Sequence, residues 1–266
     1  MPSYEEVQNL NEVLKQVPHM HPDKLLVLAV EKNVPFEVVK SVLGTKANPN
    51  VCDDDGTPVL NTAIENNDDK TVAVLLMYGA DPHQTEENKY TAFHVAASES
   101  FSTITMKLLC LFSKNVSNAT CCGGKTPFEI AIRRGDVLCV QEMLKRLPRR
   151  CVDERNSRNR NRTPLHVACD NDESDEIKIN SAKIAEYLLQ HGADPNATFD
   201  EGFASIHEAV CSQNAFLVEV LLNDPRTNPY QLTKNGHSAL DFARARGYDL
   251  IVQKLVARQN MDLSKE

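Results

Sequence analysis

The sequence predicts an all-α solenoid in which pairs of short helices repeat along the chain. A tetrapeptide with a small or hydroxyl residue in front recurs as TPVL at 57–60, TAFH at 91–94, TPFE at 126–129, TPLH at 163–166, ASIH at 204–207 and SALD at 238–241. Each is followed by an alanine, and LLVLAV supplies an earlier one. The alanines are Ala29, Ala63, Ala96, Ala131, Ala168, Ala209 and Ala243, with spacings of 34, 33, 35, 37, 41 and 34.

The second half of each unit repeats as well. Aliphatic runs occupy residues 38–43, 72–77, 104–109, 139–144, 184–189, 217–222 and 250–255. Polar turns follow several of them: KANPN at 46–50, YGADPH at 78–83, HGADPN at 191–196 and RTNPY at 226–230. One unit alone leaves its apolar surface bare, so neighbouring units must stack. We therefore expect seven repeats within residues 23–257, at about 23–55, 56–88, 89–123, 124–160, 161–201, 202–235 and 236–257.

This pattern resembles the ankyrin repeat family, whose period is about 33 residues. The TPLH tetrapeptide, the alanine, the paired leucines and the GADPN turn carry the resemblance, which covers about 90% of the chain. Repeat 1 lacks the tetrapeptide, repeat 3 ends in SKNVSNAT, and repeat 4 ends in LPRRCVDERN. The resemblance implies a short β-hairpin finger before each tetrapeptide. It also implies a role in protein–protein binding.

Local signals fit the predicted helix boundaries. Pro58, Pro127 and Pro164 suit the first helical position, and the threonine before each can cap the helix. Gly79 and Gly192 follow helix ends, where a left-handed residue is favoured.

The two ends of the chain differ from the repeats. Ser3 and Glu6 form a capping-box pattern, which predicts an N-terminal capping helix over 3–17, within residues 1–22. At the other end we expect the last helix to stop at Val256 and residues 258–266 to form a polar tail.

Composition narrows the function classes. The formal net charge of −8 disfavours general nucleic-acid binding without excluding it, because phosphate contacts dominate that affinity. No apolar run approaches the length of a membrane span, so we expect no membrane insertion. The start of the chain lacks a secretory signal, and the eight cysteines form no CxxC pair. These features predict a protein of the cytoplasm or the nucleus with reduced thiols.

The most unusual segment is the arginine-rich stretch RNSRNRNR at 155–162. The resemblance makes it the finger of repeat 5. Arg158, Arg160 and Arg162 alternate with asparagines, so a strand would present the three guanidinium groups on one face. Two interpretations stay open: a binding patch for an acidic or phosphorylated segment, or arginines that only solvate an exposed tip. The acidic stretch at 169–181 is expected to be a loop between the two helices of repeat 5, at the helix ends remote from the fingers.

The resemblance places partner binding on the finger tips and on the exposed ends of the first helices. The candidate residues are Tyr90, Arg133, Arg134, Arg158, Asn159, Arg160, Arg162, Phe203, Lys234, Asn235 and His237. Tyr90 and Phe203 are the candidate aromatic anchors, since aromatic residues and arginine dominate binding hot spots. The alternative is that these two rings fold back onto their fingers.

The motifs do not support a catalytic, nucleotide-binding or metal site. His94, His166 and His207 occupy the tetrapeptide position that the family uses for hydrogen bonds between turns. The GGKT at 123–126 lacks the first glycine of a P-loop, and His207 has no second histidine at the spacing of a zinc protease. We therefore expect no cofactor, no metal and no enzymatic activity. The predicted function is a non-catalytic scaffold or adaptor, with two alternatives: an anion or oligonucleotide sensor, or the substrate-recognition subunit of a larger enzyme complex.

Overall fold

The computed structural model describes residues 20–98, 103–113, 120–170 and 174–264. Its contacts divide the chain into two units, Met1–Cys122 and Gly123–Glu266, called unit 1 and unit 2 below. The predicted N-terminal helix over 3–17 and most of the SKNVSNAT segment lie outside the described residues.

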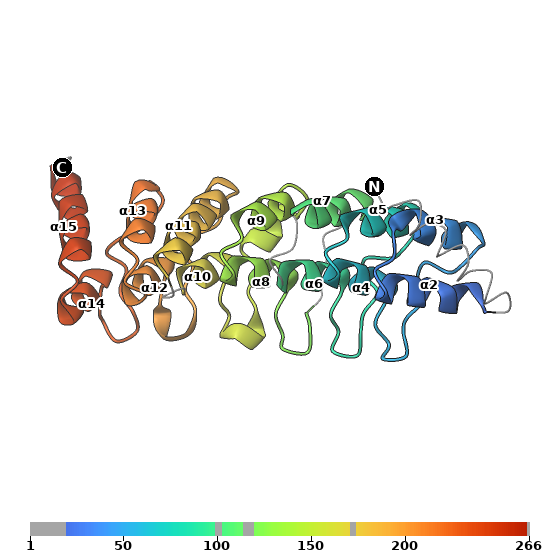
Figure 1. The fold of residues 1–266 in the computed structure, drawn as a ribbon. Helices are drawn as coiled ribbons and strands as arrows, with labels where there is room; N and C mark the ends of the chain where they lie inside the picture. The colour runs from blue at the N-terminus through green and yellow to red at the C-terminus, as the bar shows by residue number, and fades with distance from the viewer. Residues whose placement is uncertain (1–19, 99–102, 114–119, 171–173, 265–266) are drawn as a thin grey trace. The chain divides into compact units, whose positions relative to one another are not determined.

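The described residues of unit 1 form three helix pairs. They are α2 (Pro22–Glu31) with α3 (Phe36–Gly44), α4 (Val59–Glu65) with α5 (Asp69–Met77), and α6 (Ala92–Ser98) with α7 (Thr103–Phe112). The first helices α2, α4 and α6 lie side by side in one row, and the second helices α3, α5 and α7 lie in another (Figure 1).

Unit 2 contains four helix pairs in the same arrangement. They are α8 (Pro127–Arg133) with α9 (Val137–Leu144), α10 (Pro164–Cys169) with α11 (Asp175–Gln190), α12 (Ser205–Cys211) with α13 (Ala215–Asn223), and α14 (Ala239–Arg246) with α15 (Asp249–Leu263). The described residues thus hold seven helix pairs, which confirms the predicted all-α solenoid fold.

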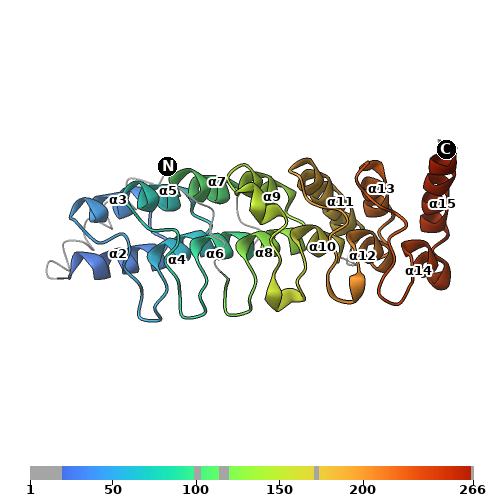
Figure 2. The same cartoon turned by 180° about the vertical axis from the view of Figure 1, so that it is seen from behind.

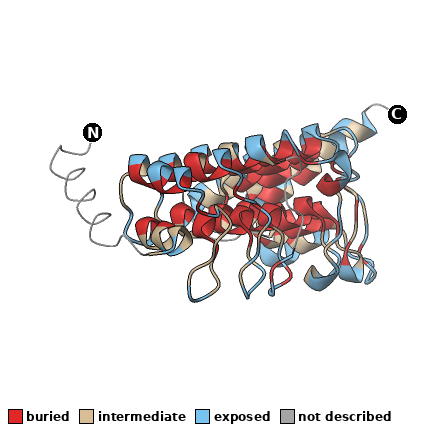
Figure 3. Ribbon diagram, turned by 90° about the vertical axis from the view of Figure 1, so that its right-hand side faces the viewer, coloured by how far each residue is buried: buried red, intermediate tan, exposed pale blue. Residues whose placement is uncertain are grey.

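The alanines that set the repeat phase are all buried, with at most 7% of their surface exposed. In each unit, buried residues concentrate where the two rows of helices face each other (Figure 3). The aliphatic runs fill this layer, with Leu75, Leu109, Leu188 and Leu221 fully inaccessible. Small residues on the first helices let neighbouring repeats approach, and leucines on the second helices fill the space between them.

Fingers project from the first-helix row of each unit (Figures 1 and 2). They are less regular than β-hairpins. Four of them hold a single antiparallel bridge each: Cys52 with Pro58, Asn156 with Arg162, Thr198 with Ala204, and Leu232 with Ser238.

Helix starts and turns mostly follow the expected chemistry. Pro127 and Pro164 are the first residues of α8 and α10. Pro58 is not, because its ψ of 137° is extended and α4 starts one residue later. The finger explains this shift, since Val59 N–H donates to Val51 O at 3.1 Å and continues the finger pairing. Gly79 and Gly192 have φ of +93° and +97°, as predicted for the turns after α5 and α11.

The acidic insertion of repeat 5 is mostly helical. The predicted loop over 169–181 is therefore wrong for residues 175–181, which belong to a helix. Helix α11 begins at Asp175, and Ser174 caps it by accepting a hydrogen bond from Ile177 N–H at 3.4 Å. Asp175 and Glu176 lie in the first helical turn, where carboxylates interact favourably with the helix dipole.

The last helix is also longer than expected. Helix α15 continues to Leu263, so a polar tail starting at residue 258 is wrong. Arg258 stabilises the extra turns by pairing with Asp262 at 3.1 Å and by donating to the carbonyl of Leu222. Tyr230 Oη donates to the same Asp262 carboxylate at 2.9 Å.

Candidate functional site

The arginines of the repeat 5 finger do not share one exposed face. The side chain of Arg162 is only 11% exposed. Its guanidinium donates to Asp170 and, at 3.2 Å, to Glu208 Oε2. The guanidinium carbon lies 4.7 Å from the centre of the Phe199 ring. Arg162 is therefore a structural residue that joins repeats 5 and 6, and its predicted exposure to a partner is wrong.

Arg133 belongs to the same network. Its Nη1 lies 3.6 Å from Asp170 Oδ2, so Asp170 sits between Arg133 and Arg162. Two arginines and two carboxylates neutralise one another, and the expected excess of positive charge is reduced here. Asp170 starts the acidic insertion, which thus reaches the base of the repeat 5 finger.

The finger backbone explains why Arg158, Arg160 and Arg162 do not alternate as they would in a strand. Residues 157–159 form a single 3₁₀ turn, and Arg160 and Asn161 have left-handed φ values of 55° and 57°. The Asn156 side chain stabilises this turn by accepting a hydrogen bond from Arg158 N–H at 3.0 Å. Asparagine readily forms such local bonds and tolerates left-handed conformations.

Arg158 and Arg160 remain exposed at the finger tip. Neither forms an ion pair with a carboxylate of the described residues. The stem of Arg158 rests on the preceding finger, because a Cβ built on Gly124 would lie 2.5 Å from Arg158 Cδ. Arg155 Nη1 donates to Thr198 O of the following finger at 2.5 Å, which ties the two fingers together.

The other predicted residues of unit 2 lie on the fingers or at the ends of the first helices. Arg134, Lys234, Asn235 and His237 are exposed, and Asn159 is half-buried. They are accessible at the surface, and their role in partner binding stays a prediction.

The two candidate aromatic anchors are half-buried, and their rings pack against histidines. Tyr90, in unit 1, lies 5.2 Å from the His94 ring. Phe203, in unit 2, lies 5.7 Å from the His207 ring. Both rings thus fold back onto the bases of their fingers, which was the alternative to fully exposed anchors. Each keeps part of its surface exposed.

Phe203 is part of a row of rings that spans repeats 5 to 7. Phe199 lies 5.0 Å from His166 and 5.9 Å from Phe203. Phe203 lies 5.4 Å from Phe242, which is half-buried on α14 and lies 5.9 Å from His237. Aromatic pairs at these distances attract beyond the area they bury.

Arg246 at the end of α14 is a functional candidate that the sequence interpretation missed. Its guanidinium carbon lies 5.4 Å from the centre of the Phe242 ring. The residue is exposed and has no ion pair with a carboxylate among the described residues. A signal was available in the repeat phase, since Arg246 follows Ser238 by the same eight positions that separate Arg134 from Thr126.

The tetrapeptide histidines perform the expected structural role. His166 Nε2–H donates to Ala197 O at 2.9 Å, and its Nδ1 accepts from Thr163 N–H at 3.2 Å. His207 makes the equivalent bond to Gln231 O at 3.0 Å. Burial lowers the pKa of His166 to about 4, and Arg162 and Arg155 act in the same direction. His166 and His207 therefore connect repeat 5 to repeat 6 and repeat 6 to repeat 7.

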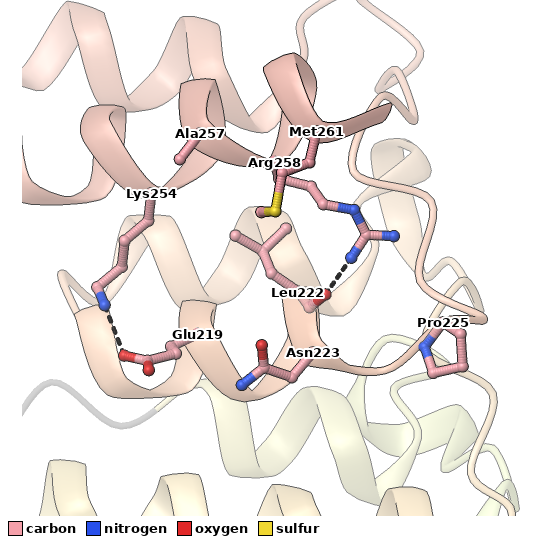
Figure 4. Close-up of a pocket in the computed structure, with 8 residues that line it drawn as sticks. All are labelled: Glu219, Leu222, Asn223, Pro225, Lys254, Ala257, Arg258 and Met261. Atoms are coloured by element: carbon pink, nitrogen blue, oxygen red, sulfur yellow. Dashed lines mark hydrogen bonds and ion pairs between the residues drawn. The ribbon is translucent and has the colours of Figure 1, made fainter. Parts of the chain in front are cut away.

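A second surface feature lies on the other side of unit 2, between α13 and α15 (Figure 4). This groove has a volume of about 480 Å³ and is lined by Leu222, Pro225, Ala257 and Met261 together with charged residues. The charges are already paired, since Lys254 Nζ lies 2.5 Å from Glu219 and Arg258 donates to Leu222 O. The groove therefore offers apolar surface without a free charge to orient a ligand.

Among the described residues, no three His, Cys, Asp or Glu side chains come together as a metal site. None of the helices in the described ranges has the length and apolar character needed to cross a membrane.

Stacked helix pairs, buried histidine links and projecting fingers define a helical repeat protein. A family model described as ankyrin repeats in three copies matches residues 26–110, 60–150 and 102–199. These matches cover more than half of the sequence, so the chain belongs to the ankyrin repeat family.

Related sequences match over part of the chain only. An ankyrin repeat protein of fowlpox virus, FPV014, is 29% identical over 116 residues, which are 44% of this chain and 26% of that protein. The palmitoyltransferase AKR1 of Lachancea kluyveri is 34% identical over 99 residues, which are 36% of this chain and 12% of the enzyme. The chain thus spans about a quarter or less of the length of these relatives.

Solved structures share the fold over most of the chain. The ankyrin repeat domain of Bcl-3, a member of the IkappaB family, has a TM-score of 0.67 at 21% identity, covering 88% of this chain and 99% of that one. The human ASB11 ankyrin repeat domain has a TM-score of 0.64 at 19% identity, with coverages of 88% and 96%. Ankyrin repeat domains generally mediate protein–protein interaction and are typically non-catalytic modules.

Proposed function

We propose that this protein is a non-catalytic scaffold or adaptor that binds a partner protein on the inner face of unit 2. The inner face is defined as the finger tips and first helices that carry Arg158, Arg160, Phe203, Phe242 and Arg246. The observation that carries the proposal is the combination of exposed arginines without carboxylate partners among the described residues and half-buried aromatic rings. Arginine and aromatic residues contribute most of the energy at protein interfaces.

The distribution of arginine supports unit 2 as the binding unit. Every arginine of the chain lies at or after Arg133, and residues 1–122 contain none. The fingers of unit 1 instead carry the acidic residues Asp53 to Asp55, Glu86 and Glu87. A guanidinium group can bind a carboxylate or phosphate through two parallel hydrogen bonds, which a lysine cannot do.

The partner we propose offers an acidic or phosphorylated segment to the repeat 5 finger. Arg158 and Arg160 would bind this segment without Arg162, because Arg162 is neutralised by Asp170 and Glu208. The Arg162 network holds the finger against repeat 6, so the two exposed arginines are presented from a fixed base. Exposed charges of this kind accelerate association with an oppositely charged partner.

We also propose a reducing compartment, the cytosol or the nucleus, as the site of action. The eight cysteines form no disulfide among the described residues, and five of them are buried. Persistent free thiols are typical of proteins in reducing compartments.

Site-specific photocrosslinking tests the inner face directly. The benzophenone amino acid p-benzoylphenylalanine would replace Phe203 in one variant and Phe216 in another. Phe216 is the matched control, because it is a phenylalanine of the same repeat that lies on the second helix α13 and is 56% exposed. We expect one discrete protein adduct from position 203 and none of that mass from position 216.

Two outcomes would contradict the proposal. Equal adducts from both positions would show that the inner face has no special role. A nuclease-sensitive adduct at position 203 would instead favour a nucleic-acid sensor, a class that the net charge of −8 disfavours.

A further inference from the structure

We infer that Phe203, Phe242 and Arg246 form an anchor subsite for an acidic side chain of the partner that lies next to an apolar side chain. This inference rests on the proposed function, because it assumes that a protein binds the inner face. It adds the place where the partner is anchored and the chemistry of the segment that fits there.

Two arginines of unit 2 each lie over a phenylalanine ring, at different positions of their repeats. In repeats 5 and 6, the Arg162 guanidinium lies 4.7 Å from the Phe199 ring and is completed by the carboxylates of Asp170 and Glu208. In repeat 7, the Arg246 guanidinium lies 5.4 Å from the Phe242 ring. No carboxylate of the described residues forms an ion pair with Arg246, in contrast to Arg162. The carboxylate that repeat 6 supplies internally to Arg162 would come from the partner at Arg246.

The neighbours of Arg246 are consistent with an open position. Burial raises the pKa of the Cys211 thiol, and the nearby Arg246 acts in the opposite direction. The thiol is a weak hydrogen-bond partner and leaves most of the guanidinium donors available. Glu208 also acts on Cys211, but it is already paired with Arg162.

The apolar half of the subsite consists of Phe203 and Phe242. Their ring centres are 5.4 Å apart, and His207 and His237 pack against the Phe242 ring at 6.0 Å and 5.9 Å. Both phenylalanines are half-buried, so their inner edges are held while part of each ring stays accessible. Rings fixed in this way lose little conformational entropy when a partner covers them.

These features select a carboxylate rather than a phosphate. A single free guanidinium matches one carboxylate through two hydrogen bonds. A phosphate carries up to two negative charges at neutral pH and needs more cations.

The geometry also limits the spacing within the partner segment. In an extended peptide, residues two apart point to the same side and are separated by about 6.6 Å. That distance is close to the 5.4 Å between the Phe242 ring and the Arg246 guanidinium carbon. The segment that fits therefore has a large apolar residue and an Asp or Glu two positions away.

A selection from a random peptide library displayed on phage tests this inference without knowledge of the natural partner. Peptides selected on the wild-type chain would be synthesised and their dissociation constants measured by fluorescence anisotropy. We expect enrichment of Asp or Glu two positions from Leu, Phe or Met. Arg246→Ala should weaken these peptides about tenfold or more, as expected for loss of a charge-assisted hydrogen-bonded pair.

Arg244→Ala is the matched control. It removes the same charge from the same exposed helix, but residues two apart on a helix do not share a face. We expect less than about a twofold effect on the same peptides, within the range of ordinary surface substitutions. Phe242→Leu serves as a second variant, and melting temperatures of all variants verify that each is folded.

The outcomes separate this inference from the proposed function. Selected peptides that bind Arg246→Ala as well as wild type, but lose affinity for Arg158→Glu/Arg160→Glu, would overturn the anchor and leave the inner face intact. Peptides without acidic enrichment would also overturn the anchor. Peptides that bind all of these variants equally would contradict both proposals.

Discussion

Arg162 and Glu208 are 46 residues apart in the sequence, yet Arg162 Nη2 lies 3.2 Å from Glu208 Oε2. Both side chains are 11% exposed, and Asp170 accepts from the same guanidinium. Burial raises the pKa of Glu208, whereas Arg162 lowers it and Asp170 raises it. Arg162 is therefore the cation shared by two neighbouring carboxylates inside unit 2.

Arg162→Ala should lower the free energy of unfolding by about 3 kcal/mol, because it leaves two partly buried carboxylates without their main cation. Arg160→Ala is the control from the same finger, and it should change stability by no more than about 0.5 kcal/mol because its side chain is exposed. Urea denaturation followed by circular dichroism measures both. Equal losses in the two variants would show that Arg162 is another solvated finger residue.

The repeat phase could be predicted from the sequence because it depends on residues within each repeat. The seven alanines, the leucine pairs and the turn glycines lie where the period placed them. The start of α4 and the end of α15 could not be predicted in the same way. Both depend on distant partners, namely Val51 for the N–H of Val59 and Leu222 for the guanidinium of Arg258.

The environment of the candidate binding residues was predicted less well. Arg162 was identified as a finger residue, but its pairing with Glu208 arises only from stacking of repeats 5 and 6. The alternation of Arg and Asn at 158–162 indicated a strand, whereas the asparagines form a tight turn. Arg246 was missed because its significance lies in the ring beneath it and in the carboxylate that its neighbours do not supply.

Ala168→Leu should overpack the seam between neighbouring first helices and lower the stability of unit 2 by about 1–3 kcal/mol. Ala168 is fully buried in α10. Ala245→Leu introduces the same side chain at an exposed position of α14 and should have little effect. Thermal unfolding compares them, and unchanged melting of the Ala168 variant would refute the repeat phase.

Acid should destabilise the protein partly through His166. Its folded-state pKa of about 4 lies below the usual value of 6.5, so the folded state favours the neutral ring. The resulting stabilisation is present above about pH 6.5 and is lost as the pH falls towards 4, to a total of about 3 kcal/mol.

The variant His166→Gln removes this titration. Its free energy of unfolding should be lower than that of wild type at pH 7, and the difference should shrink as the pH approaches 4. Urea titrations at several pH values between 7 and 4 measure both curves. Curves that stay parallel over this range would exclude His166 as a source of the acid sensitivity.

Gly79→Ala should cost about 1–2 kcal/mol, because Gly79 has a φ of +93° and an added Cβ would meet no atom within 4 Å. The cost is therefore one of backbone conformation alone. Gly79→Asn should be less harmful, since asparagine tolerates left-handed conformations better than alanine. Denaturant titration ranks the three proteins, and an alanine variant more stable than the asparagine variant would contradict this explanation.

The most direct test of the central claim is the association rate constant of the partner captured at position 203, measured at low and at high ionic strength. We expect Arg158→Glu/Arg160→Glu to slow association about tenfold at low salt, to do so less at high salt, and to leave dissociation nearly unchanged. Arg149→Glu/Arg150→Glu makes the same change in net charge at exposed positions away from the finger tip, and it should slow association far less. An association rate at low salt that is unaffected by the first variant, or equally reduced by both, would show that the finger arginines are only a solvated tip.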